Sequence, residues 1–251
     1  MTDSTLPTWA SGLDNKTALV TGAGRGLGRA CAKALAEAGA HVYAVSRTTA
    51  ELNSLRDECG ERIEPWTFDA TTDALLERVQ SLSSLDVLVN NAGTNRPQAL
   101  VDVTDDALDE MLNLNVRAAF RVARAAARVM VASDGGSIIH MSSQMGHVGS
   151  PRRTVYCMSK HAIEGLTKAM AVELAPSSVR VNSVAPTFID TPLTRPFFAD
   201  PGFTEFVMDM IPMKRLGTLD EVAAAVVYLA SPASAMVTGT SLKVDGGWTA
   251  H

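Results

Sequence analysis

The stretch from Thr17 to Gly28 constrains the fold more than any other part of the chain. A short apolar run, Thr17-Ala-Leu-Val20, leads directly into Thr21-Gly-Ala-Gly-Arg-Gly-Leu-Gly28, and a helical pattern follows as far as Ala38. A glycine-rich loop between a strand and a helix is the context in which backbone N–H groups bind a phosphate. An ordinary tight turn is the alternative for a lone glycine motif, but the strand, the helix and the spacing together disfavour it.

Strand-like and helix-like segments alternate along the rest of the chain, which favours a parallel sheet. The predicted fold class is α/β, a Rossmann-type doubly wound parallel sheet of about seven strands with helices on both faces in a single domain. We predict a flexible N-terminal arm over residues 1–15, one domain over 16–251 and an irregular segment over 186–212. The expected strands are 17–20, 41–45, a stretch ending at 68–69, 86–90, 137–141, 179–184 and 242–244. The expected helices are 29–38, 48–59, 72–82, 104–131, one that ends near 175, and 219–230.

Composition disfavours several classes of function. The net charge is −5 with both signs interspersed, which argues against nucleic acid or an anionic membrane as a partner. We find no apolar run near the ~18 residues of a membrane span, and the first residues lack the basic and apolar parts of a signal peptide. Cys31, Cys59 and Cys157 are far apart and show no Cys-x-x-Cys spacing. We therefore expect no disulfide framework and a cytoplasmic location.

Three glycines of the loop would each serve a bound dinucleotide differently. Gly22 permits the tight turn, Gly26 lets a pyrophosphate approach the backbone, and Gly28 allows the helix to pack closely on the sheet.

The residues after the second expected strand indicate which dinucleotide binds. NAD is usually recognised by an acidic residue about 20 positions after the loop, which bonds the ribose 2′-hydroxyl. Here that place reads Val45-Ser46-Arg47-Thr48 and contains no acid. A guanidinium binds a 2′-phosphate through charge-assisted bonds worth ~1.5–3 kcal/mol, and Arg25 in the loop can approach the same group. NADP(H) is therefore the preferred cofactor and NAD(H) the less favoured one, although either arginine alone would be a solvated surface residue.

Tyr156 and Lys160 are four residues apart, a spacing that places both on one face of a helix. A lysine ammonium beside a tyrosine favours the phenolate and lowers the tyrosine pKa from its usual value of about 10. The pair suits proton delivery to a carbonyl oxygen or proton removal from an alcohol. Because Tyr-x-x-x-Lys also occurs by chance on surface helices, its meaning depends on the other motifs.

Five motifs occur together in one order: Thr21-Gly-x-x-x-Gly-x-Gly28, Asn90-Asn-Ala-Gly93, Asn115, Ser143 and Tyr156-x-x-x-Lys160. From about residue 14 onward, the chain resembles the short-chain dehydrogenase/reductase family. The resemblance implies NAD(P)-dependent hydride transfer between a nicotinamide and a carbonyl or carbinol carbon, on CH–OH donors. It implies four catalytic residues. Tyr156 is the general acid and base, Lys160 lowers its pKa and bonds ribose hydroxyls, Ser143 holds the substrate oxygen, and Asn115 fixes a water on a proton route.

The resemblance also implies contacts with the cofactor. Asp69, with Ala70 beside it, matches an adenine contact. The Pro186–Thr191 segment matches a clamp on the carboxamide, although Thr187 replaces the usual glycine. The predicted cofactor-binding residues are Gly22, Arg25, Gly26, Leu27, Gly28, Arg47, Thr48, Asp69, Ala70, Asn91, Ala92, Gly93, Tyr156, Lys160, Ile189 and Thr191.

Short strings such as Ser142-Ser-Gln144 and Val155-Tyr-Cys157 look like the L-xylulose/dicarbonyl reductases, and microbial gluconate and polyol dehydrogenases look similar. We therefore expect a small polar sugar, polyol or dicarbonyl as substrate. The predicted substrate-binding residues are Ser143, Gln144, Arg153 and Tyr156, with an aromatic and methionine-rich lid over 187–213. Two alternatives stay open: a 3-oxoacyl-thioester (ACP or CoA) reductase, and a catalytically idle dinucleotide-binding scaffold.

Other side chains carry weaker signals. Cys157 and His161 have a spacing that could present two metal ligands, but no further pair is evident, so we expect no metal. His147 is near Ser143, but no Gly-x-Ser-x-Gly elbow is present, which disfavours a hydrolase. The resemblance implies a homotetramer formed through the long helix and the helix with Tyr156. The apolar positions of the latter are Ile163, Leu166, Met170 and Leu174.

Overall fold

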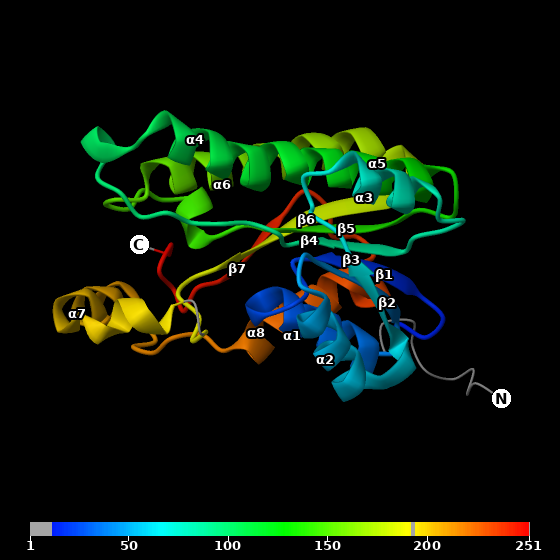
Figure 1. Ribbon diagram of the computed structural model, residues 1–251, viewed down its shortest axis with the longest axis horizontal. Helices are drawn as coiled ribbons and strands as arrows, with labels where there is room; N and C mark the ends of the chain where they lie inside the picture. Colours follow the sequence, from blue (N-terminus) through cyan, green and yellow to red (C-terminus); the bar gives the residue numbers. More distant parts are fainter. Residues whose placement is uncertain (1–11, 192–193, 251) are drawn as a thin grey trace.

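A seven-stranded sheet runs through the centre of the protein. The structure, a computed structural model, describes residues 12–191 and 194–250 (Figure 1). All strands are parallel and follow the order β3-β2-β1-β4-β5-β6-β7. Because β4 lies beside β1, the order reverses between them, and the carboxyl ends of these two strands form the switch point at which such sheets bind ligands. The strands are β1 (Thr17–Thr21), β2 (His41–Ser46), β3 (Ile63–Thr67), β4 (Val87–Asn90), β5 (Gly136–Met141), β6 (Val179–Pro186) and β7 (Ser241–Val244).

Helices cover both faces of the sheet, as the fold class predicted (Figure 1). One face carries α1 (Gly26–Glu37), α2 (Thr49–Cys59) and α8 (Leu219–Ala230). The other carries α3 (Asp73–Gln80), α4 (Asp105–Leu112), α5 (Ala119–Val131) and α6 (Thr154–Leu174). An apolar core lies on each side, and every residue of β4 is buried, as its unbroken apolar run predicted. Short 3-10 turns occur at Gly60–Arg62, Leu100–Asp102, Gln144–Gly146, Ala175–Ser177, Arg195–Ala199 and Pro232–Ser234.

The long helix expected over 104–131 is not one regular α-helix. Between α4 and α5 the chain makes a π-helical segment, η4 (Asn113–Ala118). A π-turn has the i→i+5 hydrogen bond and inserts a residue into the helix, often at a functional site. A hydrophobic pattern at the helical period does not reveal such a local change, so the sequence predicted the helical span correctly and missed the π-helical segment within it.

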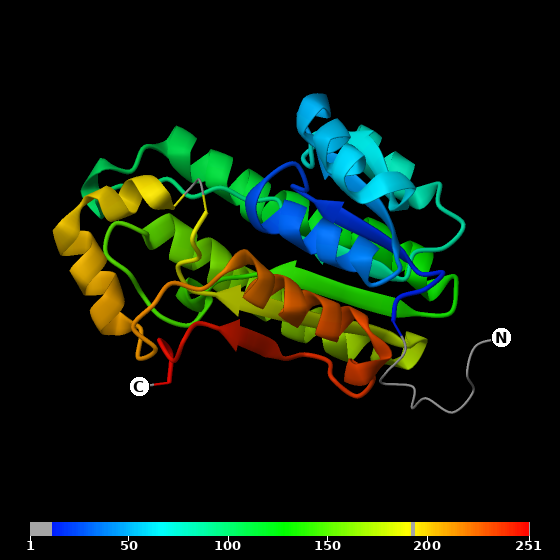
Figure 2. The ribbon, with the colours of Figure 1, turned by 90° about the horizontal axis from the view of Figure 1, so that it is seen from below.

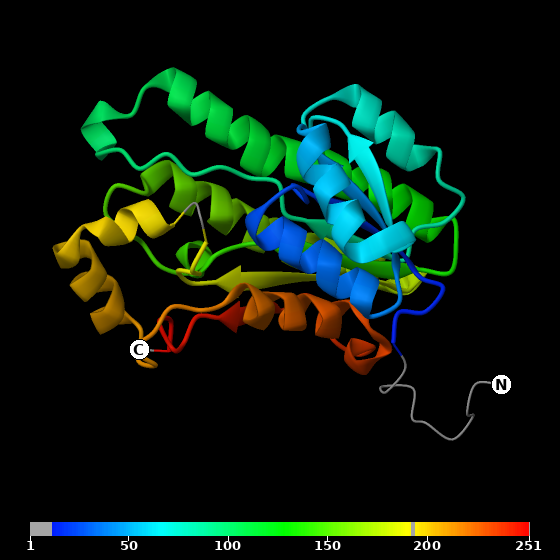
Figure 3. The same ribbon diagram turned by 60° about the horizontal axis from the view of Figure 1, so that its bottom comes forward.

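The segment expected to be irregular over 186–212 contains a ten-residue helix, α7 (Pro201–Met210). Its start follows ordinary helix rules, because the Asp200 side chain accepts a hydrogen bond from Gly202 N at 3.0 Å and Pro201 occupies the first turn. The helix lies beyond the carboxyl ends of the strands (Figures 2 and 3). The sequence prediction of an irregular segment therefore missed this helix, although Pro201 is well suited to a first helical turn.

The chain start described by the structure already belongs to the fold. Leu13 is buried, and its backbone N–H donates to the Ala38 carbonyl oxygen at 2.7 Å. Most of the arm expected over residues 1–15, namely 1–11, lies outside the described residues. Within 12–191 and 194–250, no helix is both long and apolar enough to cross a membrane.

Candidate functional site

The glycine-rich loop leaves β1 at the switch point and enters α1. Gly22 has a φ of +69°, and a Cβ added to Gly28 would lie 2.2 Å from the Gly22 carbonyl oxygen. Both positions therefore require glycine. Gly26 has a φ of +56°, and a Cβ there would meet nothing within 4 Å. The loop is thus tight beneath Gly22 and Gly28 and open at Gly26, which is the surface that a pyrophosphate needs.

The first turn of α1 presents unused backbone donors. Arg25 is the N-cap residue, and its exposed side chain makes no capping hydrogen bond. The free N–H groups and the positive end of the helix dipole favour an anion. Leu27, half-buried, packs on the core below. The loop and the helix start therefore fit the pyrophosphate of a nicotinamide dinucleotide.

Thr21 ties the ends of β1 and β4 together, a role that the sequence analysis missed. Its hydroxyl oxygen accepts hydrogen bonds from the N–H groups of Asn91 at 2.9 Å and Ala92 at 3.0 Å. The Asn91 side chain donates in return to the Thr21 carbonyl oxygen at 2.9 Å. This fixes the segment from Asn91 to Gly93 against the loop, at the place where the ribose side of the cofactor was predicted.

The corner predicted to bind the adenosine contains basic and acidic groups side by side. Arg47, at 78% side-chain exposure, lies 3.9 Å from a carboxylate oxygen of Asp69. Burial raises the pKa of Asp69, but hydrogen bonds from Thr71 and the charge of Arg47 outweigh it and hold that pKa below its usual value. Thr48 begins α2 as its N-cap residue, and Ala70 packs on the core beneath.

The stretch from Val45 to Thr48 holds no acid, but the carboxylate of Glu51 lies against the glycine-rich loop. A Cβ added to Gly24 would lie 2.2 Å from an oxygen of Glu51, and the Ser46 hydroxyl donates to that carboxylate at 3.5 Å. Glu51 belongs to the first turn of α2. Glu51 follows the end of β2 by five residues, and the first turn of α2 brings its carboxylate back against the loop.

Ser143 and Gln144 follow β5 at the same edge of the sheet. The Ser143 hydroxyl accepts from Met145 N at 3.1 Å and donates to the Gln144 side-chain oxygen at 2.9 Å. Both side chains are buried, and the Ser143 hydroxyl lies near the Tyr156 phenol and acts to lower the pKa of that tyrosine. The serine and the tyrosine that the sequence paired are therefore neighbours, and Gln144 orients the serine.

Lys160 lies below Tyr156 on α6, with its Nζ 5.5 Å from the centre of the phenol ring. The ammonium donates to the Met141 carbonyl oxygen at 2.8 Å. Burial lowers the pKa of Lys160 to about 8, against the opposing charge of Glu164. Burial raises the pKa of Tyr156 to about 12, with Ser143 and Arg153 acting in the other direction. The predicted lowering of the Tyr156 pKa by Lys160 is therefore not seen in this arrangement, since the ammonium is bound to a backbone carbonyl.

Asn115 joins the π-helical segment to the loop after β4. Its side-chain oxygen accepts from Thr94 N at 2.8 Å, and its amide donates to the Thr94 carbonyl oxygen at 2.8 Å and to the Ser159 hydroxyl at 3.2 Å. Ser159 precedes Lys160, so Asn115 links that loop to the helix of the proposed catalytic pair. The π-turn puts this amide where it reaches both.

Comparisons with known proteins show the family to which the chain belongs. A family model described as Enoyl-(Acyl carrier protein) reductase matches residues 22–249. The L-xylulose reductase of Mesocricetus auratus is 41% identical over 239 residues, which cover 94% of this chain and 98% of that protein. The chain belongs to the short-chain dehydrogenase/reductase family. It is therefore an oxidoreductase in class, and its cofactor is a nicotinamide dinucleotide.

Two further members of the short-chain dehydrogenase/reductase family are similar over nearly their whole lengths. The D-erythrulose reductase of Gallus gallus is 41% identical over 235 residues, covering 93% of this chain and 95% of that protein. A gluconate 5-dehydrogenase from Burkholderia cenocepacia, solved in complex with NADP and tartrate, is 34% identical with a TM-score of 0.89, covering 95% of this chain and 97% of the other.

Arg153 and the segment after β6 are the residues predicted to form the substrate side. Arg153 is buried at the start of α6, where burial lowers its pKa and its charge acts on Tyr156. Ile189 is buried and bridges to Gly217, and the Thr191 hydroxyl lies 3.0 Å from that of Thr194. Thr187, which replaces the family's glycine, is not among the described residues with positive φ. The threonine is therefore accommodated without strain.

An aromatic cluster stands over this side of the sheet. Phe188 packs edge-on against Phe198 and Phe203, with ring centres 5.9 and 5.5 Å apart, and lies 5.8 Å from the ring of Trp248. The lid predicted over 187–213 therefore has its own small core, and the C-terminal segment supplies part of it.

The described residues contain no group of three His, Cys, Asp or Glu side chains that could hold a metal ion. His161 instead lies 2.9 Å from the Cys157 carbonyl oxygen.

Proposed function

We propose that this protein interconverts a ketone or aldehyde and an alcohol with NADP(H), on a small sugar, polyol or dicarbonyl. The observation that carries the proposal is the meeting of Ser143, Tyr156 and Lys160 at the carboxyl edge of the sheet, beside the open phosphate loop. Family membership gives the reaction class, and the intact set argues against a catalytically idle scaffold.

Each of these side chains has a task in the reduction. The bound nicotinamide supplies the hydride. Tyr156 donates its phenolic proton to the substrate oxygen, and its raised pKa keeps that proton in place at neutral pH. The Ser143 hydroxyl, which donates to Gln144 in the structure, would turn its one proton to the same oxygen as negative charge develops there. The Lys160 ammonium stabilises the phenolate that remains after proton transfer, and Asn115 keeps the adjoining loop and helix in register.

A panel of carbonyl compounds with NADPH tests this function. We expect turnover of ketoses such as xylulose and erythrulose, of a keto-gluconate or of a simple dicarbonyl, measured as loss of NADPH absorbance. Tyr156→Phe should lower kcat by roughly 10²–10⁴-fold while NADPH binding is preserved. Turnover of an acetoacetyl thioester alone would replace the proposal with a 3-oxoacyl reductase. If no compound is turned over, the alternative of a catalytically idle dinucleotide-binding scaffold would replace the proposal.

The buried polar groups near the site support a hydroxyl-bearing substrate. Within the described residues, the side-chain oxygens of Asn95 and Gln98 are buried and have no hydrogen-bond partner. Both belong to the loop after β4, which Asn115 holds through Thr94, and Gln98 N donates to the Arg152 carbonyl oxygen at 3.1 Å. Unsatisfied buried acceptors cost ~1–3 kcal/mol each, and substrate hydroxyls could satisfy them only if this loop shifts to expose them. The names of the similar reductases and dehydrogenases point to substrates of the same kind.

The preference for NADP rests on Arg47 and Arg25, both exposed beside the loop. Asp69 and Glu51 act against it, since their carboxylates repel a 2′-phosphate. We expect Arg47→Ala to weaken NADPH binding about tenfold or more, the effect of losing ~1.5–3 kcal/mol of charge-assisted bonding. NADH binding should not change. Arg56→Ala, an exposed position on the same helix as Glu51, is the control. Equal loss for both cofactors would contradict the assignment.

We propose a homotetramer formed through α5 and α6, in the cytoplasm. Ile163 is buried, and Met170 and Leu174 are partly buried against the protein's own core, in keeping with the burial expected of these apolar positions. The outer face of α6 instead carries exposed Ala162, Gly165, Ala169 and Val172, small side chains that permit close approach. Light scattering from the purified protein tests the assembly.

The three cysteines are all free, which supports a reducing compartment.

A further inference from the structure

A row of polar side chains crosses the sheet beneath the proposed active site. Asn90, His140, Ser183 and Ser241 lie in register on β4, β5, β6 and β7. Residues in register on neighbouring parallel strands point to the same face, and this is the face that α5 and α6 cover, because Asn90 donates to the Ala119 carbonyl oxygen at 2.7 Å. A sheet buried on both faces normally has apolar residues there. The row therefore needs polar partners, and its β6 and β7 end finds them on α6.

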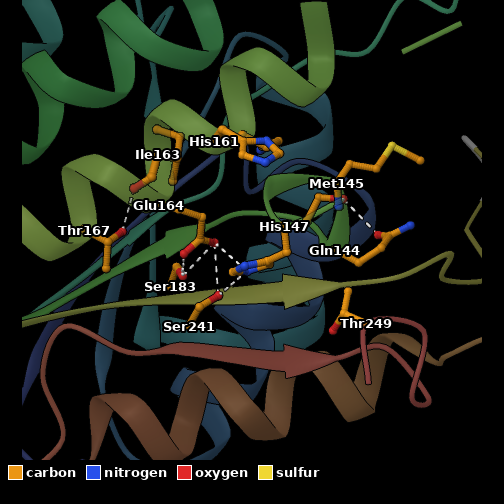
Figure 4. Close-up of polar contacts among 12 residues, drawn as sticks. Gln144, Met145, His147, His161, Ile163, Glu164, Thr167, Ser183, Ser241 and Thr249 are labelled. Carbon is orange, nitrogen blue, oxygen red and sulfur yellow. Dashed lines mark hydrogen bonds and ion pairs between the residues drawn. The ribbon is translucent and has the colours of Figure 1, made fainter. Parts of the chain in front are cut away.

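The partner on α6 is the carboxylate of Glu164, which the side chains of Ser183, Ser241 and His147 surround (Figure 4). The Ser183 hydroxyl lies 3.0 Å from both carboxylate oxygens, and the Ser241 hydroxyl donates to one of them at 3.0 Å. His147 Nε2 lies 3.4 Å from the same oxygen and 2.9 Å from the Ser241 hydroxyl. The Glu164 side chain is only 7% exposed. A buried carboxylate surrounded by donors from two strands and a loop is held in one position.

Glu164 lies one helical turn after Lys160 on α6, and both residues are buried. Four-residue spacing makes them neighbours on the same helix face. Burial destabilises the Lys160 ammonium, and the charge of Glu164 opposes that effect. A lysine in such surroundings needs an anion nearby to stay charged.

The other titratable groups around this pair do not supply that anion. His140 on β5 is neutral, because burial lowers its pKa to about 4, and Tyr156 on α6 keeps its proton. His147, facing Glu164, has its pKa lowered first by burial, with Lys243 on β7 and His161 and Lys168 on α6 acting in the same direction and Glu164 in the opposite one.

We propose that Glu164 is a positioning residue for Lys160: its carboxylate, fixed by Ser183, Ser241 and His147, keeps Lys160 in the ammonium form that proton transfer at Tyr156 requires. The inference rests on the proposed role of Lys160. It extends the proposed active site down α6 to a cluster that touches neither substrate nor cofactor.

The test is the pH dependence of kcat/KM for carbonyl reduction by the full-length protein with NADPH. In Glu164→Gln the carboxylate charge is lost and the shape is kept, so the Lys160 pKa falls. The alkaline limb should move about one pH unit lower, which makes the variant about tenfold slower on that limb and similar to wild type near pH 6. A merely structural role would lower activity equally at every pH. Glu173→Gln, the same change at an exposed position of α6, is the control and should not move the limb.

Superimposable profiles of folded Glu164→Gln and wild type would overturn the inference. If circular dichroism shows that this variant does not fold, Ser183→Ala replaces it, because it removes the donor to both carboxylate oxygens and leaves α6 unchanged. An unmoved limb in Ser183→Ala then overturns the inference. Lys160→Ala distinguishes failure of the Glu164 inference from failure of the proposed function on which it rests. If kcat/KM of that variant equals the wild-type value, Lys160 itself does not have its proposed role.

Discussion

Replacing Asn115 with alanine should destabilise the protein through the loop after β4. Asn115 is 2% exposed, and its amide satisfies both backbone groups of Thr94 as well as the Ser159 hydroxyl. Alanine removes all of these bonds at once. The Thr94 N–H and C=O are then left half-buried without partners, which is costlier than losing a bond whose other half can turn to water.

The size of the effect follows from those groups. Each unsatisfied buried group costs ~1–3 kcal/mol, and the half-burial of Thr94 favours the low end for each. A total of about 2–3 kcal/mol results. A chain of this size loses ~2–4 °C of Tm per kcal/mol, so we expect Tm to fall by roughly 4–12 °C. Thermal unfolding followed by circular dichroism without added cofactor measures this directly.

Asn113→Ala is the matched control. Asn113 belongs to the same π-helical segment, but its side chain is exposed. The substitution is chemically identical and should shift Tm by less than about 2 °C, since surface changes stay within ~0.5 kcal/mol. If the two variants had equal Tm, the loop would not depend on Asn115. A loss of kcat in Asn115→Ala without a Tm change would favour the water-holding role inferred from the family resemblance instead.

The remaining predictions concern substrate contacts and acid stability. Gln144→Ala frees the Ser143 hydroxyl from its 2.9 Å bond and should change kcat/KM, as should Arg153→Ala for substrates with several hydroxyls or a carboxylate. Unchanged kcat/KM in both would refute their assignment to the substrate. Bonds from Arg215 and Thr218 lower the pKa of Glu221 from 4.5 to about 2, so its stabilisation is complete above pH 4.5 and is lost as the pH falls towards 2. Glu221→Gln should therefore lower Tm at pH 7 and leave it unchanged near pH 2, and an equal Tm deficit at both pH values would contradict this.

The parts of the fold that the sequence predicted are those fixed by local rules. The glycine positions, the alternation of strands and helices that indicates a parallel sheet, and the buried β4 are all legible in short stretches of sequence. The serine, tyrosine and lysine come together because each follows or begins an element at the same sheet edge. Their contact was therefore predictable, although the Lys160 bond to the Met141 carbonyl was not.

Other features depend on geometry that the sequence does not display. The Glu164 cluster joins residues from α6, β6, β7 and the loop after β5, and only the strand register brings them together. The π-turn at Asn115 replaces one hydrogen-bond pattern by another without changing the apolar pattern. Glu51 contacts the glycine-rich loop because the first turn of α2 lies against that loop. The sequence does not display this contact, since it depends on the direction in which α2 leaves β2.

The contact of Trp248 with Phe188 has a practical meaning for anyone who attaches this protein to a support. Its ring is buried and also lies 6.2 Å from that of Phe206 on α7, so the final strand is followed at once by the wall of the lid. A fusion or linker joined after this segment pulls on the substrate side. One joined before Leu13 leaves from the opposite, amino-terminal edge of the sheet, where β1 begins. Immobilisation through that edge leaves the predicted lid unattached.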